Sequence, residues 1–207
     1  MFRNLLKPDS ALMITMGQIT DCIFLSLFWL MGCFPVVTAG ASFAALYDAT
    51  FRGFRRGEKK VWHRFFKVFR ENWKAGILPT AAVVAVFALV LRLTVRLWNA
   101  VAAGAVSAMA FSAGAFVAVL ILGVLSVVFP MLSRFENSLG GLLKNAVLVA
   151  LSNLPRTLGL GIVNAATIFL CARFVVPLFF LPALSALIGS LFIEPMFKPY
   201  MPQEEAA

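Results

Sequence analysis

The side chains that could carry out catalysis or bind a metal are few and far apart. His63 is the only histidine, and Cys22, Cys33 and Cys171 lie in apolar stretches without a C-x-x-C pair. A catalytic nucleophile needs a base beside it, and a zinc site needs a cluster of thiolates and imidazoles. The sequence contains no such grouping, no H-E-x-x-H and no phosphate-binding Gly-Lys loop. We therefore expect no enzymatic activity, no metal site and no cofactor.

One carboxylate, Asp21, lies near the middle of an apolar stretch. A charge at the centre of a membrane helix costs about 2.5–3.5 kcal/mol, so we expect this side chain to face other helices. Arg92, Arg96 and Arg173 are candidate ion-pair partners. A structural ion pair, a protonated carboxyl bonded to Ser or Asn, or a pathway for a solute or proton would each explain Asp21. Arg92 and Arg96 can instead snorkel to the outer interface near Trp98.

Half of the basic residues, nine of eighteen, lie between Arg52 and Lys74. On a helical wheel, residues 59–74 separate into an aromatic face and a cationic face. The aromatic face holds Trp62, Phe65, Phe66, Phe69 and Trp73, and the cations opposite include Lys60, Arg64, Lys67 and Lys74. This pattern is typical of a helix in the membrane interface, where each cation gains about 1 kcal/mol from an anionic leaflet. Packing on the protein itself and docking of a partner are the alternatives, and nucleic acid is not an expected ligand. Asp48 is placed to neutralise nearby Arg52.

The composition identifies a membrane protein. Hydrophobic residues make up 61% of the chain and charged residues only 13%, against about 45–50% and about 25% in ordinary globular domains. The net charge of +9 agrees with basic residues gathered on cytoplasmic loops beside spans. We expect an all-α, polytopic transmembrane helical bundle that forms a single membrane domain.

We expect six membrane segments, with five as the alternative count. They cover residues 11–34, 36–51, 76–98, 101–129, 157–176 and 178–193. Pro35, Pro130 and Pro177 mark the ends of three of them. The segments 36–51 and 178–193 are short, since sixteen helical residues span roughly 24 Å and the hydrocarbon core measures about 30 Å. They either cross with local thinning of the bilayer or re-enter it.

Small residues and charge suggest how these segments are arranged. Segment 101–129 is rich in Gly, Ala and Ser, which let helix backbones approach closely, so we expect it at the centre of the bundle. Residues 131–155 read as a cytoplasmic turn and a partly embedded helix. A hairpin over residues 11–51 places Arg3, Lys7 and the basic stretch on one side. We expect a bacterial cell-membrane protein with both termini in the cytoplasm and the basic helix on an anionic inner leaflet.

Two stretches of the chain share their pattern with a known family. Residues 34–74 resemble the YesL family of bacterial membrane proteins. The points of likeness are Pro35, Thr38, Gly40, Ala45-Leu46-Tyr47, Arg56-Gly57-Glu58 and Phe65-Phe66 with Phe69. A later region, from Arg134-Phe135-Glu136-Asn137 to Leu154-Pro155-Arg156-Thr157, is similar to a second block of that family. Together these stretches cover about a third of the chain.

The resemblance has modest implications for function. The YesL family has no established biochemical activity, and its members are often encoded beside genes for carbohydrate uptake and polysaccharide degradation. It therefore implies an accessory role near sugar transporters, with an ABC-transporter permease as the expected partner, and it supplies no ligand residues. A small solute carrier that uses Asp21 is the alternative, and an intramembrane enzyme ranks third.

Overall fold

The computed structural model describes residues 11–135 and 138–201, and this part of the chain is helical throughout, without a strand. The helices are α2 (Ala11–Cys33), α3 (Ala39–Thr50), α4 (Val61–Asn72), α5 (Ile77–Ala102), α6 (Ala108–Arg134), α7 (Leu139–Ser152), α8 (Leu154–Arg173) and α9 (Leu181–Phe197). Short helical turns cover Val36–Thr38, Phe51–Arg55, Val176–Phe179 and Lys198–Tyr200.

Five of the described helices are long and apolar enough to cross a membrane, which is the alternative count given above. They are Thr15–Cys33, Ile77–Ala102, Ala108–Arg134, Leu154–Arg173 and Leu181–Tyr200. The expected sixth segment, residues 36–51, instead forms the twelve-residue α3, and ten of those residues are buried. The helix continues without a break into the turn Phe51–Arg55, but Arg52 ends its apolar part, which at about 20 Å is shorter than the hydrocarbon core is thick. Its apolar composition serves packing inside the protein. The chain is thus a multi-pass helical membrane protein.

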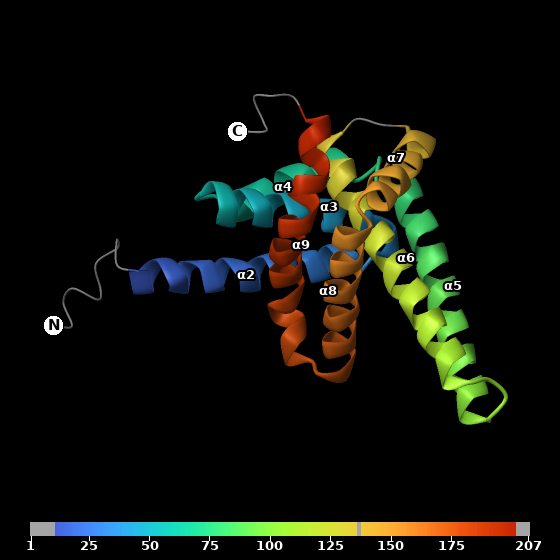
Figure 1. Ribbon diagram of the computed structural model, residues 1–207. Coiled ribbons are helices and arrows are strands. Elements are labelled where there is room, and N and C mark those ends of the chain that lie inside the picture. The colour runs from blue at the N-terminus through green and yellow to red at the C-terminus, as the bar shows by residue number, and fades with distance from the viewer. Residues whose placement is uncertain (1–10, 136–137, 202–207) are drawn as a thin grey trace.

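Two helical hairpins, α5–α6 and α8–α9, form the body of the bundle and meet along α6 and α8 (Figure 1). We call the end at which α5 and α8 begin, and α6 and α9 finish, the basic end. α4 and α7 lie at this end (Figure 1). Every Lys and Arg of the described residues lies there except Arg92, Arg96 and Arg173.

Glycines set the closest helix contact. A Cβ at Gly123 would lie 2.1 Å from the carbonyl oxygen of Thr157, and one at Gly161 would lie 2.1 Å from that of Val119. Only glycine permits this approach of α6 to α8. α6 also contacts α3, α5 and α7. The helix therefore lies at the bundle centre as expected, but through Gly123. The small residues at its start, Ala108, Ala110 and Ser112, are exposed at the far end of the α5–α6 hairpin.

The first hairpin joins α2 to α3. Trp29 packs edge-on against Phe43, with ring centroids 5.1 Å apart, and a Cβ at Gly32 would lie 2.1 Å from Ser42 Oγ. The two helices therefore run antiparallel, while α2 crosses α9, which it contacts (Figure 1). Arg3 and Lys7, on which the expected cytoplasmic N-terminus depends, fall outside the described residues.

Several boundaries differ from the expected ones. α6 begins at Ala108 because Ser107 caps it, its Oγ accepting from the Ala110 N–H at 3.4 Å. The connection before it turns at Gly104, whose φ of +71° suits glycine. Pro130 does not end α6, which continues to Arg134. A proline inside a membrane helix is tolerated where neighbouring helices cover the disrupted turn, and Pro130 is buried.

Candidate functional site

The basic helix α4 is packed on the protein along one side. Val61, Phe65 and Val68 are buried, and Phe65 shares a cluster with Leu25 of α2 and Ala49 of α3. This is the internal packing given above as an alternative. The expected aromatic face is therefore divided, because Phe65 faces the protein instead of the membrane interface.

The other part of that face remains uncovered. Trp62, Phe66 and Trp73 are 53%, 49% and 45% exposed, and Phe69 is half-buried. Lys60, Lys67 and Lys74 are exposed as well, and the Lys74 Nζ lies 5.3 Å from the centre of the Trp73 ring. Exposed aromatic rings beside lysines give α4 one surface suited to a membrane interface.

Asp48 forms the buried electrostatic centre of the basic end. Its side chain is only 1% exposed and accepts from Arg52 Nε at 3.1 Å and from Arg64 Nε at 2.5 Å. Burial lowers the pKa of Arg64, but the hydrogen bond and the charge of Asp48 outweigh it, and the net shift is upward. The expected pairing of Asp48 with Arg52 is confirmed. Arg64, expected among the surface cations, instead joins α4 to α3.

A second polar cluster, which the sequence did not suggest, links α3, α6 and α9. Glu194 Oε1 accepts from Tyr47 Oη and from Arg134 Nη2, both at 2.7 Å. The Arg134 guanidinium also lies over the Phe51 ring, 4.6 Å from its centre. Burial raises the pKa of the Tyr47 phenol well above its ordinary value, and the Glu194 charge adds to the rise. Phenol, carboxylate and guanidinium thus hold three helices together.

The structure separates the charged residues that were expected to pair inside the membrane. Asp21 is half-buried on α2, while Arg92 and Arg96 are exposed on α5. Arg173 ends α8 with its guanidinium 5.5 Å from the Phe174 ring centre. None of these arginines forms an ion pair with Asp21 in the described part of the chain.

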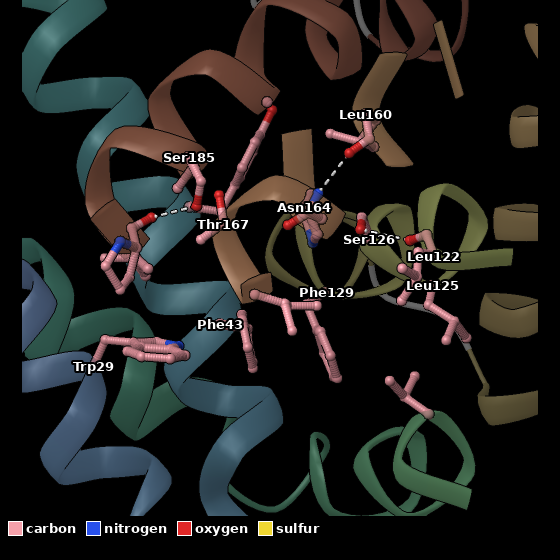
Figure 2. A pocket seen from close by; sticks show the side chains of 18 of the residues that line it. Trp29, Phe43, Leu122, Leu125, Ser126, Phe129, Leu160, Asn164, Thr167 and Ser185 are labelled. Carbon is pink, nitrogen blue, oxygen red and sulfur yellow. Dashed lines mark hydrogen bonds between the residues drawn. The ribbon is translucent and has the colours of Figure 1, made fainter. Parts of the chain in front are cut away.

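An apolar cavity of about 360 Å³ lies between the two hairpins, with α2 and α3 contributing to its wall (Figure 2). Four polar side chains of the body line it: Ser126, Asn164, Thr167 and Ser185. Aromatic and aliphatic side chains make up most of the rest, among them Trp29, Phe43, Phe87, Phe129, Leu160 and Ile168. Asp21, Arg92 and Arg173 do not line it. Among the described residues, no group of three or more His, Cys, Asp or Glu side chains could hold a metal ion.

The comparison with protein families gives one match. A family described as "Protein of unknown function, DUF624" matches residues 22–92, about a third of the chain. The match runs from α2 to the middle of α5 and includes Asp48 and all of α4. No curated protein and no solved structure matched. The chain is therefore similar, over its N-terminal helices, to a family whose function is not known.

Proposed function

We propose that this protein is a non-enzymatic accessory component of a solute-uptake system in the bacterial cell membrane. Its proposed partner is the permease of an ABC transporter, and carbohydrate is the proposed solute class. The resemblance to the YesL family supports this proposal, whereas the family that matches residues 22–92 has no known function and adds no role. The observation that carries it is the uncovered state of α5.

α5 offers a long surface to another membrane protein. Only 11% of the most apolar stretch of α5 is buried. Among the long helices, α5 contacts α6. Arg92 and Arg96 are exposed on it, one turn apart. A lipid-facing arginine in a span is costly, and a carboxylate on a neighbouring helix would reduce that cost. We therefore assign the permease contact to α5.

The distribution of Lys and Arg bears on the orientation of the protein in the membrane. Most Lys and Arg of the described residues lie at the basic end, and the positive-inside rule favours a cytoplasmic position for it. We propose that α4 lies on the inner leaflet, with Trp62, Phe66 and Trp73 in its interface, and that the opposite end, with Arg173, faces outward.

A quantitative pull-down from native membranes tests the proposal. The tagged protein is extracted in polymer nanodiscs, and co-purifying proteins are measured by mass spectrometry. We expect a transporter permease at near-equal stoichiometry, and its loss in the double variant Arg92→Leu/Arg96→Leu. The matched control is Arg173→Leu, which removes a cation from the same end but not from α5. Recovery of the wild-type chain without a permease would overturn the proposal.

The cavity favours a second candidate, a small solute carrier. Its walls come from both hairpins, and movement of one hairpin against the other would change access to it. Solute flux into liposomes containing only this protein would support the carrier. Because Asp21 lies outside the cavity wall, we expect Asp21→Asn to leave any such flux unchanged.

A further inference from the structure

The cavity lies at the depth of the lipid hydrocarbon. Asn164 and Thr167 line it from α8, ten and thirteen residues after Leu154 at the basic end. At 1.5 Å per residue they lie about 15–20 Å along a helix that crosses the membrane. Val84 of α5 and Ile168 of α8 also belong to its wall and are 41% and 43% exposed. The cavity therefore opens sideways, between helices, to the bilayer interior.

No charged side chain belongs to the described wall. The lining residues are apolar apart from a few hydroxyl groups, one amide, one indole and one thiol. A bound ion at this depth would have no counter-charge from these residues, which makes an anionic or cationic ligand costly. A volume of about 360 Å³ is within the range of about 300–1,000 Å³ usual for small-molecule sites. The wall thus suits an uncharged, largely apolar molecule.

The hydrogen bonds made within the wall determine which donors and acceptors remain available to a ligand. Ser126 donates to Leu122 O at 2.7 Å, Thr167 to Val163 O at 2.8 Å and Ser185 to Pro182 O at 2.9 Å.

The Asn164 amide is used in part in the same way, because one of its two Nδ2 hydrogens is bonded within α8 and the other is left as a donor. Its Nδ2 donates to Leu160 O at 2.9 Å, and Figure 2 shows this bond beside the cavity. Each hydroxyl has one hydrogen, which its own helix takes. The oxygen lone pairs of these groups, including Asn164 Oδ1, are left as acceptors. The Trp29 Nε1 donor is buried and has no partner among the described residues. What the open wall offers to a ligand is therefore mainly acceptors.

We propose that the cavity binds an uncharged lipid that carries a hydroxyl group. Its apolar chain fills the space between the hairpins, and its hydroxyl donates to the acceptors around Asn164 and Thr167. An ordinary acyl chain would fill the volume without using these acceptors. A sugar has several hydroxyl oxygens to satisfy, whereas the donors that the wall leaves are the second Asn164 N–H and the Trp29 Nε1–H. The hydroxyl group is what distinguishes the proposed ligand from the acyl chains of the surrounding lipid.

Fluorescence quenching of Trp29 tests the proposal. Trp62, Trp73 and Trp98 are exposed and are replaced by Phe, so that the remaining indole lies in the cavity wall. The purified protein in mild detergent is titrated with dibrominated stearyl alcohol and, in parallel, with dibrominated methyl stearate. The ester has a chain of the same length and no hydroxyl. We expect half-maximal quenching by the alcohol at a concentration about tenfold lower.

Variants of the wall complete the test. Asn164→Leu and the near-isosteric Thr167→Val should each reduce the preference for the alcohol several-fold, and Ala186→Phe should abolish quenching by filling the cavity. Ala166→Phe is the matched control, because Ala166 lies on the exposed side of α8 and does not line the cavity. Thermal unfolding of each variant checks that it folds. Equal quenching by alcohol and ester, or full quenching of Ala186→Phe, would overturn the proposal. The pull-down above does not depend on this result, so the two proposals can fail separately.

Discussion

The two ends of the bundle differ in how their charged side chains are buried and paired. At the basic end, Asp48 is buried between two arginines, and Glu194 joins Arg134 to Tyr47. At the opposite end, Arg92, Arg96 and Arg173 are exposed and pair with none of the described carboxylates. Asp48, Glu194 and their arginines therefore serve the internal structure of the basic end, while Lys60, Lys67 and Lys74 are exposed there.

The largest effect should come from the packing that supports the basic end. Phe65→Ala removes a fully buried ring between α4, α3 and α2, and we expect a loss of about 3–5 kcal/mol in unfolding free energy. Phe66→Ala is the matched control, since Phe66 is 49% exposed and should cost less than about 1 kcal/mol in detergent. Unfolding titrations in mixed micelles measure both. Equal losses would mean that α4 is not fixed in the described orientation.

Asp48→Asn should have the next largest effect. The substitution leaves Arg52 and Arg64 without their buried counter-charge. Breaking a buried pair costs about 3–5 kcal/mol, and the lower figure applies because these arginines are 21% and 24% exposed. The control is Glu58→Gln, whose carboxylate is 44% exposed and 3.9 Å from Arg52, and it should change stability by less than about 0.5 kcal/mol. If both variants unfold alike, the basic end does not depend on Asp48.

Tyr47→Phe should cost less, about 1.5 kcal/mol. It removes one hydrogen bond to a carboxylate but leaves Glu194 its 2.7 Å contact with Arg134. The same unfolding titration measures the loss. A loss as large as that of Asp48→Asn would show that the phenol of α3 contributes more to holding α9 in place than the Arg134–Glu194 ion pair, which joins α6 to α9.

The same tyrosine should make stability depend on pH. Burial and Glu194 raise the pKa of the folded-state phenol, whereas in the unfolded chain it ionises near pH 10. The advantage of the wild type over Tyr47→Phe is fully present below about pH 10. It declines as pH rises further, because the unfolded state loses its proton first. Unfolding measured between about pH 8 and pH 11 should show this decline. Tyr200 is exposed and serves as the control. The difference in unfolding free energy between the wild type and Tyr200→Phe should not decline over the same pH range.

Local sequence patterns predicted much of this structure, and long-range contacts explain what they missed. The helical period of α4 is visible in its aromatic spacing, but Phe65 and Phe66 lie on the same side of the wheel. Phe28 and Leu25, about forty positions upstream, together with Ala49 of α3, determine that Phe65 is covered. The Asp48–Arg52 pair lies within one turn and was foreseen.

The Tyr47–Glu194 bond joins residues 147 positions apart and left no local signal. The cavity likewise depends on side chains from six helices, none unusual in its own segment. Whether residues 36–51 cross the membrane was left open for a related reason. A short helix of small residues can be a weak span or a buried helix, and only the helices packed around it distinguish the two.

The smallest effect should come from the opposite end. Arg173→Leu removes an exposed cation whose described neighbour is the Phe174 ring, and a change within about 0.5 kcal/mol is expected. Arg92→Leu and Arg96→Leu should be equally mild for the isolated protein, because both side chains are exposed. If α5 binds a permease, these two variants will destabilise the complex while leaving the purified chain unaffected, and Arg173→Leu will do neither. A large loss in the isolated chain would place the arginines of α5 in its own structure, and the contrast between the two ends would fail.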